Sequence, residues 1–126
     1  MAAEPGLRSV GQIALNAKDV ERATAFYRDQ LGLKMLFTAP GLAFFDCGGV
    51  RLMLSGAEEP EFDHPSSILY FKVDDIEVSH RALAERRVEF RRPPHVIHRS
   101  PGMELWMAFF RDSEGNTLAL QCERRA

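Results

Sequence analysis

Cysteine is scarce in this sequence, and long apolar runs are absent. The chain of 126 residues has two cysteines, Cys47 and Cys122, which lie far apart and outside any Cys-x-x-Cys pattern. This spacing favours neither a disulfide framework nor a cysteine-based metal site, so we expect a reducing, cytoplasmic setting. Residues 1–6 lack the apolar segment of a secretory signal, and no stretch is apolar enough to predict a membrane span.

A strong charge of either sign is also missing. The formal net charge is -2, with 16 Lys and Arg against 18 Asp and Glu residues spread along the chain. Proteins that bind nucleic acid concentrate positive charge on one face, so we expect no nucleic-acid partner. The pairs Arg86-Arg87 and Arg91-Arg92 are short and typical of a solvated surface. The hydrophobic share of 45% is ordinary for a globular domain.

The first half of the chain predicts a strand, a helix and three further strands. Asp19 is a suitable N-cap for the helix, which ends at Gly32. Gly48-Gly49 is a two-residue turn that tolerates positive φ angles and predicts a hairpin between the last two strands. From their apolar patterns, the strands are expected at residues 10–16, 34–38, 43–47 and 50–55.

The second half predicts the same order of elements after a polar segment. Asp75 caps the expected helix. Pro93-Pro94 interrupts the chain after the next short strand, so the following residues as far as Gly102 are expected to form a loop. The strands are expected at residues 68–73, 88–91, 104–111 and 117–122.

The repeated order predicts an α+β fold built from two tandem βαβββ modules. We place the first module at residues 9–57, a linker at 58–66 and the second module at 67–123, within a single domain that spans 1–126. Each module alone is too small to bury a stable core. Two modules side by side would place the helices outside and form a concave sheet cleft that both modules share.

Several short sequence blocks lie in this order and together cover nearly the whole chain. They are Ile13-Ala14-Leu15-Asn16, Asp19-Val20-Glu21-Arg22-Ala23, Phe26-Tyr27-Arg28-Asp29, Leu31-Gly32-Leu33, Phe71-Lys72-Val73-Asp74-Asp75-Ile76 and Phe110-Arg111-Asp112-Ser113-Glu114-Gly115-Asn116. In this arrangement the sequence resembles the vicinal-oxygen-chelate superfamily, which contains glyoxalases, bleomycin resistance proteins and ring-cleaving dioxygenases. The resemblance implies the same βαβββ fold.

The resemblance also implies where a metal would bind. Enzymes of this superfamily hold a divalent cation through His and Glu side chains from the first and last strands of each module. In this sequence the corresponding positions are Gln12, Met53, Ile68 and Ala119. Glutamine is a weak neutral donor and the other three side chains are not the usual ligands, so we expect neither a metal nor another cofactor.

Strand parity predicts which side chains line the cleft. Phe44 is expected to pair with Met53, and Phe110 with Ala119. The resulting lining is aromatic and apolar with few polar groups, which is typical of a small-molecule site. The predicted ligand-binding residues are Gln12, Phe44, Arg51, Met53, Ile68, Tyr70, His95, Glu104, Trp106, Phe110, Ala119 and Gln121.

Structural roles compete with these assignments. Asp46 opposite Arg51 is expected to form a cross-strand ion pair. Glu104 is either a general base, if desolvated, or a solvated edge residue. His95 and His98 are candidates for ligand contact, for an alternative metal site with Glu104, or for plain surface residues. Four residues are of types found more often in a buried core than in a ligand wall: Phe44, Met53, Trp106 and Phe110.

Three hypotheses for function remain. The favoured one is a homodimeric binding protein that takes a small aromatic or amphipathic molecule in a metal-free cleft, as metal-free antibiotic-resistance members of the superfamily do. The second is a lyase, epimerase or dioxygenase with a non-standard metal site, or a metal-free isomerase. The third is a domain with a collapsed cleft that serves interaction only. The sequence leaves open which ligand binds and whether the modules pair within one chain or exchange between chains.

Overall fold

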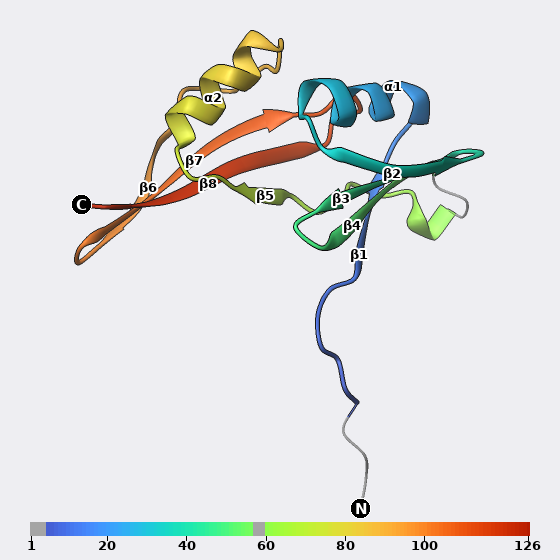
Figure 1. Ribbon diagram of the computed structural model, residues 1–126, viewed down its shortest axis with the longest axis horizontal. Coiled ribbons are helices and arrows are strands. Elements are labelled where there is room, and N and C mark those ends of the chain that lie inside the picture. Colours follow the sequence, from blue (N-terminus) through green and yellow to red (C-terminus); the bar gives the residue numbers. More distant parts are fainter. Residues whose placement is uncertain (1–4, 57–59) are drawn as a thin grey trace, which may run out of the picture.

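Two four-stranded sheets lie side by side along the long axis of the molecule, with both helices on the same side of them (Figure 1). The computed structural model describes residues 5–56 and 60–126, so part of the predicted linker lies outside the described residues. The order of strand, helix and three strands occurs twice. This confirms the predicted α+β arrangement with helices outside.

The first sheet has the strand order β1-β4-β3-β2. Its strands are β1 Gln12–Asn16, β2 Lys34–Ala39, β3 Leu42–Cys47 and β4 Val50–Ser55. Strand β1 is parallel to β4, whereas β3 is antiparallel to both of its neighbours. Gly48 and Gly49 have φ angles of 59° and 91° and close the predicted β3–β4 hairpin.

The second sheet repeats this topology in the order β5-β8-β7-β6. Its strands are β5 Leu69–Lys72, β6 His95–Ser100, β7 Met103–Arg111 and β8 Thr117–Arg125. Strand β6 lies where a loop was predicted, and that prediction is wrong. The β-branched Val96 and Ile97 favour an extended chain, and Gly102, with φ 79°, closes the turn into β7. The predicted strand at 88–91 is reduced to one bridge between Phe90 and Phe110.

Aspartate side chains start both helices, as predicted. Asp19 accepts a hydrogen bond from the backbone N–H of Arg22 at the start of α1, Val20–Ala25. Asp75 accepts from the N–H groups of Glu77 and Val78 at the start of α2, Ile76–Glu85. A π-helical turn, η1 (Phe26–Gln30), continues α1. Each helix packs on the sheet of its own half.

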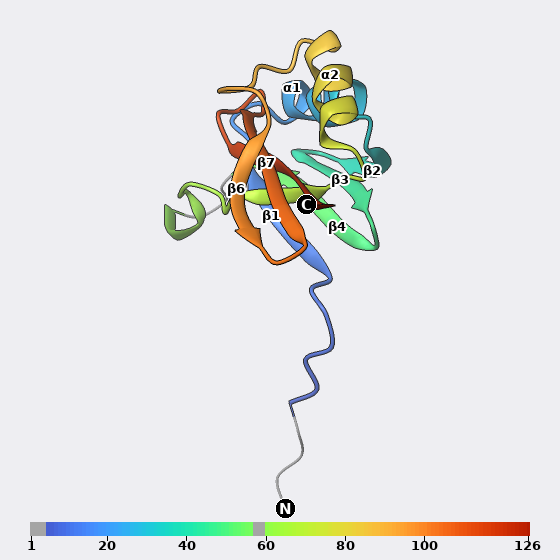
Figure 2. The ribbon, with the colours of Figure 1, turned by 90° about the vertical axis from the view of Figure 1, so that its left-hand side faces the viewer.

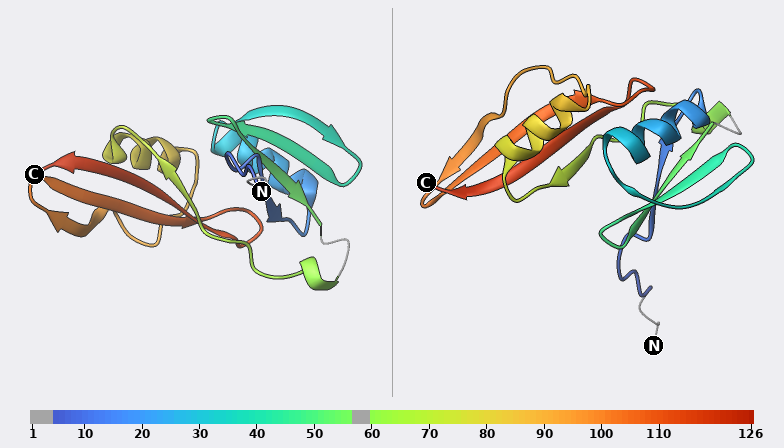
Figure 3. Two further views of the ribbon diagram at one scale, coloured as in Figure 1. Left: turned by 90° about the horizontal axis from the view of Figure 1, so that it is seen from below. Right: turned by 45° about the horizontal axis from the view of Figure 1, so that its top comes forward.

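One hydrophobic core joins the two halves on the helix side. It is formed by α1, β1, β3 and β4 of the first half together with α2, β7 and β8 of the second. Figure 2 shows the two helices together above the strands, and the right-hand view of Figure 3 shows them one after the other along the molecule. The largest fully buried side chains are Tyr27, Phe45, Phe110, Leu15, Leu52, Leu54, Ile76 and Leu118. The sheet faces away from the helices are therefore left for other contacts.

A short 3-10 turn, η2 (Pro60–Phe62), lies between the halves. Asn16 at the end of β1 donates from Nδ2 to the carbonyl of His64, and its backbone N–H donates a 2.9 Å hydrogen bond to Oγ of Ser66. The segment after η2 is thus fastened to the first sheet. Among the helices of the described ranges, none has the length and apolar character needed to cross a membrane.

Candidate functional site

The face of the first sheet that points away from α1 carries four of the predicted ligand-binding residues. Cross-strand partners share a face, and residues of the other parity, such as Phe45 and Leu52, lie in the core. The expected pairings of Phe44 with Met53 and of Asp46 with Arg51 are confirmed. We call this surface the first open face; its predicted members are Gln12, Phe44, Arg51 and Met53.

Arg51 is the central polar group of the first open face. Its Nε atom donates a 2.8 Å hydrogen bond to Oε1 of Gln12, and its guanidinium lies 5.1 Å from the ring centroid of Phe44. The amide of Gln12 in turn donates from Nε2 to Sδ of Met53 at 3.7 Å. The arrangement supplies a cation held against an aromatic ring.

The expected ion pair between Asp46 and Arg51 is not among the contacts of the described residues. Asp46 instead accepts a hydrogen bond from the backbone N–H of Gly49 at 3.3 Å. A short aspartate side chain next to a tight turn reaches the turn backbone more easily than a neighbouring strand. This leaves the guanidinium of Arg51 with a neutral amide partner.

Aromatic rings extend the first open face towards its outer strand. Phe37 of β2 stacks on Phe44 with ring centroids 4.4 Å apart. Phe37 is 48% exposed and its neighbour Leu36 is 43% exposed, which is unusual for large apolar side chains. Sequence analysis missed Phe37, because a bulge between Met35 and Phe37 shifts the register of β2 and hides its parity.

A pocket of about 490 Å³ lies at the other end of the first open face. Its floor is Ala14, Asn16, Leu42, Met53 and Ser55 of the sheet, and its further wall comes from the segment after η2. The volume lies within the range of small-molecule sites. Among the predicted residues, only Met53 lines this pocket. This wall consists of Phe62, which ends η2, and of His64, Ser66 and Ser67 after it.

The corresponding face of the second sheet, which we call the second open face, carries four other predicted residues. Tyr70 pairs with Ala119 and Lys72 with Gln121 across β5 and β8. Phe109, not predicted, also pairs with Ala119, and its ring meets Tyr70 edge to face at 5.9 Å. Ala119 itself is fully buried under these neighbours. The four predicted residues are Tyr70, His95, Ala119 and Gln121. Ile68 lies just before β5 and is 44% exposed.

The predicted position of Phe110 on the cleft side is wrong. Phe110 pairs with Leu118, and Phe109 takes the place opposite Ala119. The turn at residues 112–116 has the predicted length and is closed by Asp112, which accepts from the N–H groups of Glu114 and Asn116. The expected pairing was one residue out of register with that turn, which places Arg111 opposite Thr117. Phe110 consequently lies in the core, next to Phe90.

Trp106 and Glu104 share the parity of Phe110, so their predicted places on the cleft side are also wrong. Trp106 pairs with the buried Cys122 and packs against the core, with the guanidinium of Arg124 lying 4.6 Å from its ring centroid. Glu104 pairs with Arg99 across the strands and accepts a 2.9 Å hydrogen bond from it. Both side chains therefore lie on the helix side of the sheet.

Glu104 is poorly suited to the role of general base. The hydrogen bond from Arg99, followed by one from Trp106, lowers the pKa of Glu104 below its ordinary value. A carboxylate stabilised in this way holds a proton weakly. His95 and His98 pair with Met107 and Leu105, on the face opposite to Glu104. The three side chains thus do not converge into the alternative metal site.

The four positions that correspond to superfamily metal ligands do not fit a divalent cation. The Oε1 atom of Gln12 already accepts from the positively charged Arg51, and a second cation there would be repelled. Met53 offers only a soft sulfur atom, and the side chains of Ile68 and Ala119 have no donor atom. Within residues 5–56 and 60–126, no group of three or more His, Cys, Asp and Glu side chains is placed to bind a metal ion.

His95, on the second open face, has a buried side-chain nitrogen that makes no hydrogen bond among the described residues. Its Nδ1 lies 3.3 Å from the carbonyl oxygen of Pro93. Its Nε2 is buried and has no partner among the described residues. A buried imidazole nitrogen without a partner is costly to the folded state.

A polar network fastens the two halves to each other at the β7–β8 turn. The hydroxyl of Tyr27 donates a 2.7 Å hydrogen bond to Oδ2 of the buried Asp112, and burial together with Asp112 raises the pKa of Tyr27. Arg22 forms two hydrogen bonds with Glu114, whose side chain is 1% exposed. The Arg22 hydrogen bond lowers the pKa of Glu114 to about 2. This network orients the two open faces relative to one another.

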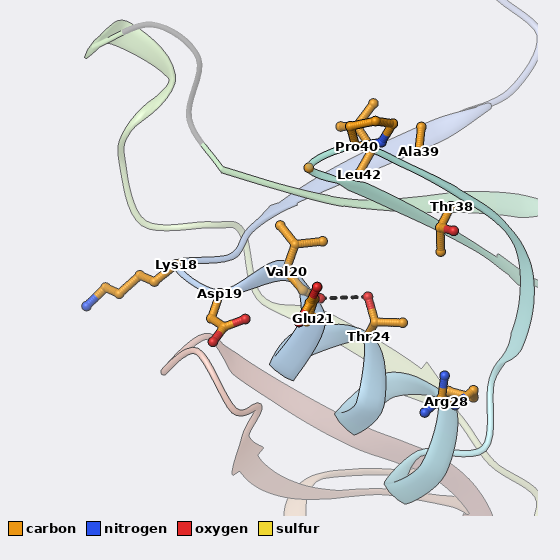
Figure 4. A pocket seen from close by; sticks show the side chains of 11 residues that line it. Lys18, Asp19, Val20, Glu21, Thr24, Arg28, Thr38, Ala39, Pro40 and Leu42 are labelled. Carbon is orange, nitrogen blue, oxygen red and sulfur yellow. Dashed lines mark hydrogen bonds between the residues drawn. The ribbon is translucent and has the colours of Figure 1, made fainter.

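A larger pocket of about 690 Å³ lies between α1 and the β2–β3 turn (Figure 4). Its walls carry charges of both signs from Lys18, Asp19, Glu21 and Arg28. Within it, Thr24 donates a 2.6 Å hydrogen bond to the carbonyl of Val20, which belongs to the helix itself. None of the predicted ligand-binding residues lines this pocket, and its mixed charge selects no ligand class.

A family model and a related protein each match nearly the whole chain. The model of the Glyoxalase/Bleomycin resistance protein/Dioxygenase superfamily matches residues 9–120. A glyoxylase-like domain-containing protein of Didymella fabae is 31% identical over 91% of this chain and 93% of that protein. Both matches agree with the resemblance drawn from the sequence blocks.

Solved structures of this kind superpose well on the chain. Lactoylglutathione lyase from Agrobacterium tumefaciens is 26% identical, with a TM-score of 0.71 over 94% of this chain and 96% of that one. TnmS3, an antibiotic binding protein from Streptomyces sp. CB03234, is 23% identical, with a TM-score of 0.74 over 94% of this chain and 98% of that one. The fold thus occurs in an enzyme and in a binding protein.

Proposed function

Because this chain belongs to the Glyoxalase/Bleomycin resistance protein/Dioxygenase superfamily, we propose that it binds a small aromatic or amphipathic molecule against its open faces without a metal. The observation that carries this proposal is the contact of Arg51 with both Gln12 and the ring of Phe44. It places a cation beside an aromatic wall at the position where a metal ligand would otherwise stand. TnmS3, which shares this fold, is an antibiotic binding protein.

The composition of the open faces supports an aromatic or amphipathic ligand. Phe37 and Phe44 form a stacked pair on one face, and Tyr70 and Phe109 form an edge-to-face pair on the other. Flat apolar groups bind well against such rings. The few polar groups nearby, among them Arg51, would fix the orientation of the ligand.

The donor chemistry favours binding over a metal-dependent reaction. Gln12 is the only one of the four corresponding positions with an oxygen donor, and Arg51 already uses that oxygen. A lyase, epimerase or dioxygenase of the usual kind needs several His or Glu ligands around one cation. The alternative general base, Glu104, lies on the helix side of its sheet.

A homodimer in the cytoplasm completes this proposal. Phe37 and Tyr70 are 48% and 44% exposed on the two open faces. If the first open face of one copy met the second open face of another, these rings would be buried and would enclose a cleft. Cys47 and Cys122 are both free thiols, which suits a reducing compartment.

The test compares two arginines that each cover an aromatic ring. The probe is 1-anilinonaphthalene-8-sulfonate, an aromatic anion that fluoresces in apolar sites. We expect Arg51→Ala to weaken its binding by about tenfold, roughly 1.4 kcal/mol, whereas Arg124→Ala, which uncovers Trp106 on the helix side, leaves binding unchanged. Equal affinities of both variants and the native protein would refute binding at the first open face.

A second arm of this test addresses the metal. Exhaustive dialysis against a chelator should leave probe affinity unchanged. Loss of binding after chelation, restored by one equivalent of Zn²⁺ or Ni²⁺, would instead favour the enzyme alternative.

A further inference from the structure

A third pocket, which we call the junction pocket, lies on the helix side where the two halves meet. Its volume is about 350 Å³. One wall comes from the end of η1 and from β3, and the other from β5 and α2. It belongs to neither open face, because Phe110 and Leu120 in its floor are core residues under α2. Its lining is Leu31, Leu33, Cys47, Phe71, Lys72, Val73, Ser79, Ala82, Leu83, Arg86, Phe110 and Leu120.

The lining of the junction pocket is mainly apolar, and the charge that it carries is positive. Nine of the twelve lining residues are apolar or, like Cys47, carry only a thiol. The charged members are Lys72 and Arg86, and no carboxylate side chain belongs to the lining among the described residues. Lys72 pairs with Gln121 on the side of the second open face, so Arg86 is the cation that the helix side presents to the pocket. An apolar pocket with a cation and no acid is complementary to a molecule with an apolar body and one anionic group.

Arg86 is held over the pocket by contacts that join the two halves. Its carbonyl accepts a 3.0 Å hydrogen bond from Nε2 of Gln30, and its own Nη1 lies 3.5 Å from the carbonyl of Gln30. The guanidinium approaches Gly32 so closely that a Cβ there would lie 3.0 Å from Nη1. Gly32 also has φ +74°, a conformation that favours glycine.

The guanidinium of Arg86 retains free donors. It has five N–H groups, of which one makes the long contact with Gln30. None of the ion pairs among the described residues includes Arg86 or Lys72. A guanidinium binds a carboxylate through two parallel hydrogen bonds, and such bonds are stronger than those between neutral groups.

We propose that the junction pocket binds a small carboxylic acid with an apolar chain, with the chain between Phe71 and Leu83 and the carboxylate at Arg86. The volume of 350 Å³ suits a short chain and lies at the lower end of the range for small-molecule sites. Because the walls come from both halves, the bound acid also fastens the halves together. This site is separate from the proposed open-face site and takes a ligand of different shape.

Octanoate is the probe, and the thiol of Cys47 is the reporter. Cys47 is part of the pocket wall and half-buried, whereas Cys122 is buried in the core. Alkylation of each cysteine by iodoacetamide is followed by peptide mass spectrometry, with Cys122 reporting any global opening. Saturating octanoate should slow alkylation of Cys47 by about tenfold, and octanol, which lacks the charge, should protect far less.

Two arginines of the same element provide the matched comparison. Arg86→Gln removes the cation at the pocket, and Arg81→Gln removes an exposed cation elsewhere on α2. We expect about tenfold weaker octanoate binding for Arg86→Gln, as for the loss of a charge-assisted hydrogen bond, and native affinity for Arg81→Gln. Ser79→Phe, which fills the pocket from α2, should abolish protection by octanoate.

Three results would overturn the proposal. They are an alkylation rate of Cys47 that octanoate leaves unchanged, equal protection by octanol, and equal affinity of the two glutamine variants. Far-UV circular dichroism checks that each variant folds. If Ser79→Phe does not fold, the comparison between Arg86→Gln and Arg81→Gln still decides.

Discussion

The Nε atom of Arg51 donates a 2.8 Å hydrogen bond to Oε1 of Gln12, so a guanidinium occupies the only oxygen donor among the four positions that correspond to superfamily metal ligands. We therefore expect purified protein incubated with Zn²⁺ or Ni²⁺ and then desalted to retain far less than one metal ion per chain, measured by elemental analysis. Gln12→Ala should not change that content. One equivalent of metal that disappears in Gln12→Ala would contradict this prediction.

Local chemistry explains why much of the fold could be predicted from the sequence. Asp19 and Asp75 stand directly before apolar helical patterns, and both cap helices. Gly48-Gly49 stands between two apolar strands and forms the hairpin. In each case the deciding interactions lie within a few residues of the chain, so the pattern of neighbouring residues was sufficient.

The second half of the candidate site was predicted less well, because one pairing was placed one residue out of register. The turn at residues 112–116 was predicted as the structure has it, and this turn places Arg111 opposite Thr117 and Phe110 opposite Leu118. The expected pairing of Phe110 with Ala119 departs from that register by one residue, which moves every side chain of the strand to the opposite face. What neighbouring residues could not predict is the contact of Asp112 with Tyr27 from the other half of the chain.

The buried hydroxyl of Tyr27 gives a prediction about stability. Tyr27→Phe removes its 2.7 Å hydrogen bond to Asp112 and should lower the free energy of unfolding by about 1–3 kcal/mol. Tyr70→Phe, which alters an exposed tyrosine of the second open face, should stay within about 0.5 kcal/mol of the native protein. Urea titration measures both values, and equal effects would contradict a structural role for the Tyr27–Asp112 bond.

The lowered pKa of Glu114 predicts how the stability of the fold depends on pH. Its pKa is lowered from 4.5 to about 2, first by the hydrogen bond from Arg22, so the folded state binds a proton less readily than the unfolded state. Its contribution to stability is therefore complete above pH 4.5 and is lost as the pH falls towards about 2. Each unit of this pKa shift corresponds to about 1.4 kcal/mol.

Glu114→Gln tests that dependence on pH. The variant should be less stable than the native protein at pH 7, and the difference should shrink between pH 4.5 and the pKa of about 2. Thermal unfolding across this range measures it. A difference in stability that stays constant with pH would show that Glu114 contributes through packing and not through its charge.

Trp106 gives a spectroscopic check on which face carries the site. Its ring lies on the helix side beneath Arg124. An aromatic ligand bound only at the first open face should therefore leave collisional quenching of Trp106 by acrylamide unchanged, whereas Arg124→Ala should increase it. Strong protection of Trp106 by the ligand would mean that the ligand binds on the helix side.

The exposed rings of the open faces predict that two chains associate. Phe37 is 48% exposed on β2, the outer strand of its sheet, and charge at this place should be incompatible with a buried interface. We expect native protein to have twice the chain mass of 14.2 kDa in light scattering and Phe37→Asp to have the mass of one chain. Val78→Asp, at a residue that is 55% exposed on α2, is the matched control and should remain dimeric. If Val78→Asp separates the chains and Phe37→Asp does not, the interface lies on the helix side, and the open faces would have to bind their ligand without a partner chain.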